Sequence, residues 1–128
     1  MEARIYALTD SHQEARNLSK LLSGITNLEK DKSPFIVLDC GDLFKGIYDK
    51  NLCVNTYLKF KELNPNAKIY ITIGNNDFGF DNRSFEYFKS VIKQFRDAGI
   101  NFVCGNLKDG ENYSDICPRY KILDINND

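Results

Sequence analysis

The chain alternates between short apolar runs and longer segments with helical periodicity. Four runs have the apolar, β-branched and aromatic content typical of strands, at residues 3–8, 35–38, 68–73 and 100–104. The run 35–38 is apolar at every position, as a strand buried on both faces requires. Residues 120–125 alternate in polarity and predict a fifth strand, which follows a polar loop over residues 108–118.

Three helices are predicted between these strands, because apolar residues recur there at spacings of three and four. They cover residues 13–28, residues 51–63, and a segment that Asp81 or Asn82 caps and that Gly99 ends. The apolar positions that define them are Leu18, Leu21, Leu22, Ile25 and Leu28, then Leu52, Tyr57, Phe60 and Leu63, then Phe85, Phe88, Val91, Ile92 and Phe95.

The element order is therefore βαβαβαβ with one further strand. This order predicts an α/β fold, in which a mostly parallel sheet is flanked by helices and joined by right-handed crossovers. A length of 128 residues with 42% hydrophobic content suits a single domain over residues 1–128.

Charge and composition limit the classes of partner. Seventeen Lys and Arg against 18 Asp and Glu give a net charge of -1, so we expect no general nucleic-acid or anionic-membrane binding. The start of the chain lacks a signal-peptide pattern and no apolar run could span a bilayer, which favours a cytoplasmic location. The four cysteines form no C-x-x-C pair, and we expect them to be buried and reduced.

Polar side chains follow successive strands of the predicted sheet. Asp10 and His12 follow the first strand, Asp42 the second and Asn75 the third. Ligands of open α/β sheets bind beyond the carboxyl ends of the strands, so these four side chains are candidate metal ligands. Their mixed oxygen and nitrogen donors suit Mn, Fe, Zn or Co. The alternative is that each residue only caps a helix or forms a turn.

The three blocks D-x-H (Asp10, His12), G-D (Gly41, Asp42) and G-N (Gly74, Asn75) resemble the first metal-binding blocks of calcineurin-like metallophosphoesterases. The stretches L-D-C-G-D-L-F-K-G at residues 38–46 and A-G-I-N-F-V-C-G-N-L at residues 98–107 resemble the branch of 5'-nucleotidases and 2',3'-cyclic-nucleotide phosphodiesterases.

The resemblance implies the first half of an α/β/β/α sandwich that hydrolyses phosphomonoesters or phosphodiesters of nucleotide type. By this likeness, Asp10 and His12 would bind one metal ion and Asn75 a second, while Asp42 would bridge the two. In the complete family fold a second sheet packs on the first. We therefore expect residues such as Ile71, Ile73 and Val103 to lose part of their cover here, and the chain to form homo-oligomers through that face.

The chain departs from the family pattern in two ways. Asn76 stands where the family has a catalytic His, and Gly79 stands where the nucleotidase branch has the Asp that orients it. The family's further metal-binding histidines come from its second half, whereas His12 is the only histidine here and the chain ends at Asp128. We therefore expect one metal ion or none, and a domain that is incomplete or inactive by itself.

Two other functions fit parts of the pattern. A non-catalytic module could bind a phosphate or nucleotide at the strand ends, with Phe44, Phe78 or Phe80 stacking on a base. A receiver-type signalling domain also alternates strands and helices, but it needs an acidic pair after the first strand, where this chain offers Asp10 alone.

Overall fold

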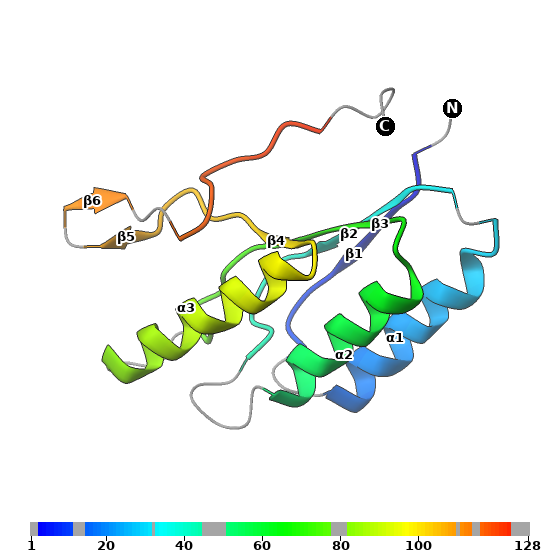
Figure 1. Cartoon of the computed structure of the whole chain (residues 1–128), viewed down its shortest axis with the longest axis horizontal. Coiled ribbons are helices and arrows are strands. Elements are labelled where there is room, and N and C mark those ends of the chain that lie inside the picture. Colours follow the sequence, from blue (N-terminus) through cyan, green and yellow to red (C-terminus); the bar gives the residue numbers. More distant parts are fainter. Residues whose placement is uncertain are drawn as a thin grey trace.

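The computed structural model describes residues 3–11, 15–31, 33–44, 51–77, 82–109, 111–113 and 116–123. The main elements are three helices and four strands, and a small hairpin follows them (Figure 1). In chain order they are β1 (Ile5–Leu8), α1 (Ala15–Leu28), β2 (Phe35–Asp39), α2 (Asn51–Leu63), β3 (Ala67–Ile71), α3 (Asn82–Asp97), β4 (Ile100–Phe102), β5 (Lys108–Asp109) and β6 (Asn112–Tyr113).

The sheet is parallel with the strand order β1-β2-β3-β4, which confirms the predicted α/β fold. Because each strand lies next to its predecessor, right-handed crossovers place all three helices on the same face. Figure 1 shows the helices together on one side of the sheet, with residues 116–123 crossing the opposite side. The described part of the chain contains no helix long and apolar enough to cross a membrane.

The core lies between this sheet and the helices. Val37, Ile69 and Ile100 point into it from three strands and are fully buried. Aromatic rings from the helices complete it: Phe95 stacks on Phe102 at a centroid distance of 5.6 Å, and Tyr57 meets Phe95 edge to face at 5.9 Å. Such pairs add to the free energy that apolar burial provides.

The predicted helices agree closely with the observed ones. Helix α2 has the predicted bounds, while α1 begins at Ala15 and the first predicted residues of that helix lie outside the described ranges. Helix α3 begins at Asn82, and Gly99 after it has the left-handed φ of 78° expected of a residue that ends a helix.

The C-terminal prediction was wrong for the residues that are described. Residues 120–123 form no strand, and the side chains of Tyr120 and Ile122 are 75% and 81% exposed. Residues 124 and 125 lie outside the described ranges. The antiparallel pair β5–β6 occupies the stretch predicted as a loop. Alternating polarity alone therefore did not identify the strands correctly in this part of the chain.

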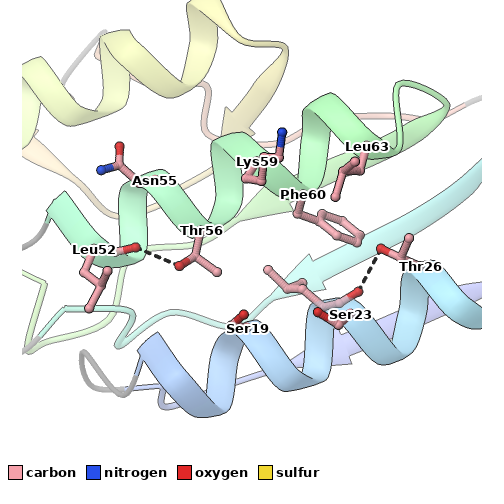
Figure 2. Close-up of a pocket in the computed structure, with 10 residues that line it drawn as sticks. Ser19, Ser23, Thr26, Leu52, Asn55, Thr56, Lys59, Phe60 and Leu63 are labelled. Atoms are coloured by element: carbon pink, nitrogen blue, oxygen red, sulfur yellow. Dashed lines mark hydrogen bonds between the residues drawn. The ribbon is translucent and has the colours of Figure 1, made fainter.

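Two apolar residues of α2 were also misplaced. Leu52 and Leu63 are 60% and 59% exposed, because the helix turns only Cys53, Val54, Tyr57 and Phe60 into the core. Leu21 and Leu28 of α1 are exposed as well. Figure 2 shows Leu52 and Leu63 along a groove between α1 and α2, where the hydroxyls of Thr56 and Thr26 donate to carbonyls of their own helices. These two hydroxyls therefore donate hydrogen bonds within their own helices.

The two expectations made for the cover of the sheet hold for some residues and fail for others. Strand β2 is buried on both faces except at Leu38, which is 36% exposed, whereas Ile36 on the same helix-free face is buried. Ile71 faces the helices and is buried, whereas Ile73 and Val103 are partly exposed. Self-association through this face stays a prediction that sedimentation can test.

The four cysteines are free thiols. Cys53, Cys104 and Cys117 are buried as expected, but Cys40 is exposed because it directly follows the last residue of β2.

Candidate metal and phosphate site

Backbone strain marks the loops that follow β1 and β2. Asp10 and Asp42 both have a φ of 55°, in the left-handed region that non-glycine residues rarely adopt. The Asp10 N–H donates to the Gly41 carbonyl at 3.1 Å, which fixes the two loops against each other. Strained residues of this kind cluster at functional sites, where surrounding contacts hold them in place.

Glycines allow the loops after β2 and β3 to approach closely. A Cβ atom on Gly74 would lie 2.1 Å from Asp42 Oδ1, and one on Gly41 would lie 2.6 Å from Gly74 N. Neither position has room for a side chain. The Asp42 carboxylate therefore lies directly against the backbone of the G-N block.

Both carboxylate oxygens of Asp42 accept hydrogen bonds from Asn76. The backbone N–H of Asn76 donates to Oδ1 at 2.9 Å and its side-chain Nδ2 donates to Oδ2 at 3.0 Å. Asn76 thus holds the orientation of the carboxylate that is the candidate bridging ligand.

The carboxylate of Asp77 links the loop after β2 to the loop after β3. It accepts the N–H groups of Phe44 at 2.7 Å, Gly74 at 2.8 Å and Asp42 at 3.0 Å. The side chain is buried, and this burial raises its pKa to about 6 although the three N–H donors act in the opposite direction. Asp77 is thus a structural link between loops that carry candidate ligands.

Asp39 anchors the start of the loop after β2. Its Oδ1 accepts the Gly41 N–H at 3.0 Å and its Oδ2 accepts the Tyr57 hydroxyl at 2.5 Å. Burial raises the pKa of Asp39, and burial next to this carboxyl also raises the pKa of Tyr57 well above its usual value. The pair connects α2 to the loop that presents Asp42.

The described candidate residues lie at the carboxyl edge of the sheet, and hydrogen bonds join some of them. Asp42 and Asn76 are hydrogen-bonded, Asn75 is exposed beside them, and Asp10 is tied to the same loops through Gly41. His12 and Gly79 lie outside the described residues. Phe44 is fully buried against Phe88 of α3, so it packs against a helix and is not placed to stack on a base, and Phe78 and Phe80 lie outside the described ranges.

The fit to a metal ion is partial. The oxygen donors of Asp10, Asp42 and Asn75 suit a divalent cation in their chemistry. However, the described ranges bring together no three His, Cys, Asp or Glu residues that could hold an ion, and both Asp42 oxygens are hydrogen-bonded to Asn76. Each of these oxygens has a second lone pair, so a cation at Asp42 would share the carboxylate with Asn76.

Three residues of this network, Asp39, Tyr57 and Asp77, were missed by the sequence analysis as functional candidates. Asp39 precedes the G-D block and Asp77 follows the G-N block. For Asp39, an acidic residue at the end of a buried strand is a usable signal. The contact of Asp39 with Tyr57 depends on packing between β2 and α2 and has no signature in the sequence.

The site combines a parallel α/β sheet with carboxylate and amide side chains at its carboxyl edge, which is where α/β proteins bind their ligands. The calcineurin-like phosphoesterase family matches residues 3–127, and the chain belongs to this family. No curated protein and no solved structure gives a significant match. The family match favours a phosphoesterase over the receiver-type alternative.

Proposed function

We propose that this chain acts on phosphate esters with a divalent transition metal ion, Mn, Fe, Zn or Co, held by Asp10, His12, Asp42 and Asn75. The observation that carries the proposal is the tight link between the strand-end loops, in which Asp77 binds the N–H groups of both Asp42 and Gly74. This link fixes Asp42 and the neighbouring Asn75 relative to each other. Preorganised donors are what binding of a metal or phosphate requires.

The same residues set a limit on the reaction. When bound, the metal supplies Lewis-acid activation of water and of the phosphoryl group. Asn76 occupies the position of the family's catalytic His, and its amide can donate a hydrogen bond to a phosphate oxygen but cannot transfer a proton at neutral pH. General acid catalysis typically contributes ~10²- to 10⁴-fold. We therefore propose slow hydrolysis that relies on positioning and charge stabilisation.

The substrate class is a finer proposal. The stretches 38–46 and 98–107 resemble the branch of 5'-nucleotidases and 2',3'-cyclic-nucleotide phosphodiesterases, so we propose a nucleotide-like ester. By the same likeness the chain corresponds to the amino-terminal half of such a domain, and a longer chain or a partner would supply the remaining metal ligands.

One experiment tests the metal and the reaction together. The purified chain is loaded with Mn²⁺, desalted, and assayed for bound metal and for hydrolysis of bis(p-nitrophenyl) phosphate. We expect retained metal and slow turnover, and we expect both to be lost in Asp42→Asn. Asn55→Ala, an exposed change on α2, is the matched control. Metal retention that Asp42→Asn leaves unchanged would show that the proposed ligands are wrong.

A non-catalytic phosphate-binding domain is the second candidate, and the Asn at position 76 favours it. Isothermal titration with AMP, with and without Mn²⁺, separates the two functions. Binding without turnover of any ester supports the non-catalytic phosphate-binding domain, whereas metal-dependent turnover supports the phosphoesterase.

A further inference from the structure

Two buried cysteines lie side by side where the chain returns to β4 after the β5–β6 hairpin. Cys104 follows β4, and its N–H donates to the Pro118 carbonyl at 3.0 Å. A Cβ atom on Gly105 would lie 3.5 Å from the Arg119 carbonyl oxygen, and Arg119 Nε donates to the Gly105 carbonyl at 3.3 Å. The backbone at Cys104 is therefore in direct contact with the residues that immediately follow Cys117.

The thiols of Cys104 and Cys117 share one environment. Both side chains belong to the apolar core, with exposed fractions of 7% and 4%. Burial and the charge of the neighbouring Cys104 raise the pKa of Cys117 to about 11, while the Cys104 N–H acts in the opposite direction. The Arg96 guanidinium of α3 donates to the Ile116 carbonyl, which holds the chain at the residue before Cys117. The two sulfur atoms are therefore neighbours in the reduced chain.

The other two cysteines are placed differently. Cys40 follows β2, and β3 lies between β2 and β4, so Cys40 and Cys104 are two strand spacings, or roughly 10 Å, apart. A disulfide spans Cα separations of about 4.4–6.8 Å, whereas backbones joined by a hydrogen bond lie only about 5 Å apart. Cys53 is buried on the helix side of the sheet, while Cys40 borders the opposite side, so these two are not placed to pair.

We propose that a peroxide joins Cys104 and Cys117 in a disulfide bond, which fastens residues 116–118 to the end of β4. The bond encloses the β5–β6 hairpin in a covalent loop. It requires neither a metal ion nor a phosphate ester, so it is independent of the proposed function.

The reaction is balanced with hydrogen peroxide as the oxidant. Cys104 is the more exposed of the two, so its thiolate attacks one peroxide oxygen and becomes a sulfenic acid, and the hydroxide that leaves takes up the thiol proton to form water. The Cys117 sulfur then attacks the sulfenic sulfur, the S–O bond breaks, and the hydroxide leaves with the Cys117 proton as a second water. Two thiols and one peroxide thus give one disulfide and two waters, and two electrons pass from the sulfur atoms to the peroxide oxygens.

The disulfide also changes a contact at the carboxyl edge of the sheet. In the reduced chain the Cys104 thiol donates to Asn106 Oδ1 at 3.2 Å. A disulfide sulfur carries no hydrogen and cannot donate. Oxidation therefore releases the side chain of the exposed Asn106, which lies just beyond β4 at the edge where α/β sheets bind ligands.

Peptide mapping tests the bond. The wild-type chain, reduced and kept in EDTA, is treated with hydrogen peroxide, blocked with N-ethylmaleimide and digested with trypsin. Cleavage at the neighbouring basic residues places Cys104 in peptide 97–108 and Cys117 in peptide 109–119. We expect mass spectrometry to find these two peptides joined by a bond that dithiothreitol breaks. The variant Cys40→Ser should keep this link.

Cys40 and Cys53 are the matched control, because they are 13 residues apart, as are Cys104 and Cys117. The entropy of loop closure depends on this separation, so both pairs should link to a similar extent in the urea-unfolded chain. In the folded chain we expect the Cys104–Cys117 link to exceed every other link at least about tenfold, because folding raises the effective concentration of these two thiols. A folded chain that forms no such link, or that links both pairs equally, would overturn the proposal.

Amide hydrogen exchange tests whether the bond fastens the segment. The Cys104 N–H, which donates to Pro118, should exchange at least about tenfold more slowly in the oxidised wild type, since a cross-link restrains local opening. Peroxide should leave this rate unchanged in Cys117→Ser. A linked chain with an unchanged exchange rate would show that the bond does not restrain residues 116–118, and this result would also overturn the proposal.

Discussion

The two faces of the parallel sheet have very different environments although alternate residues of the same strands form them. On the helix face, Ile69 and Val37 are fully buried. On the opposite face, Leu38 is partly exposed and Tyr70 and Val103 border an open groove. The cause is topology, because consecutive parallel strands with right-handed crossovers place every helix on one side. The contribution of an apolar residue to stability therefore depends on the cover at its own position, since Ile36 is buried although it shares the open face with Leu38.

The largest expected effect contrasts one aliphatic truncation on each face. Ile69→Ala removes a fully buried side chain between β3 and the helices, and should lower the free energy of unfolding by about 3 kcal/mol. Leu38→Ala on the open face should cost less, about 1–2 kcal/mol, because part of that side chain is already exposed to solvent. Urea unfolding of both variants measures the difference. Similar losses would mean that another molecule or segment covers the open face.

The second effect is a pH dependence from the buried carboxyl of Asp77 in the strand-end loops. The pKa of Asp77 in the folded chain is about 6, above the value of about 3.9 for an unfolded Asp. The folded state thus binds more protons between these values, so its contribution is fully present below pH 4 and is lost as the pH rises through 6. In EDTA this amounts to roughly 2–3 kcal/mol.

The variant Asp77→Asn should lack this dependence, as shown by urea midpoints measured from pH 4 to pH 7. Asp31 is the opposing control: its hydrogen bond to Arg4 lowers its pKa, so its contribution is present at higher pH and is lost as the pH falls. If the stability of the wild type and of Asp77→Asn rose by the same amount between pH 4 and pH 6, Asp77 would be ionised over that whole range.

A smaller effect compares two tyrosine hydroxyls on the two faces. Tyr57→Phe leaves the buried Asp39 without one donor and should cost about 1–3 kcal/mol. Tyr70→Phe removes a hydroxyl from a partly exposed ring beside the groove and should change stability by less than about 0.5 kcal/mol. Urea unfolding measures both. Equal losses would show that the Tyr57–Asp39 bond adds nothing specific.

The sequence predicted what depends on local pattern. The bounds of α2, the left-handed Gly99 after α3 and the parallel sheet follow from periodicity and turn residues, as do the positions of Asp10, Asp42 and Asn75 after their strands. Long-range contacts were not predictable in this way. The exposure of Leu52 and Leu38 depends on which elements pack together, and the contacts of Asp39 and Asp77 join residues far apart in the chain.

The smallest expected effect concerns Asn76, which touches the candidate ligand without belonging to the predicted metal set. Its Nδ2 donates to Asp42 Oδ2, so the amide occupies one of the two lone pairs of this oxygen and competes with a cation for its negative charge. Asn76→Ala removes that donor and keeps the backbone N–H that bonds Oδ1. We expect Mn²⁺ to bind about three- to tenfold more tightly, the equivalent of one neutral hydrogen bond.

Electron paramagnetic resonance of free Mn²⁺ measures the affinity, and Asn55→Ala, on the exposed side of α2, should not change it. Weaker binding in Asn76→Ala would mean that the amide holds Asp42 in a position favourable for the metal, and that the hydrogen bond helps cation binding instead of competing with it.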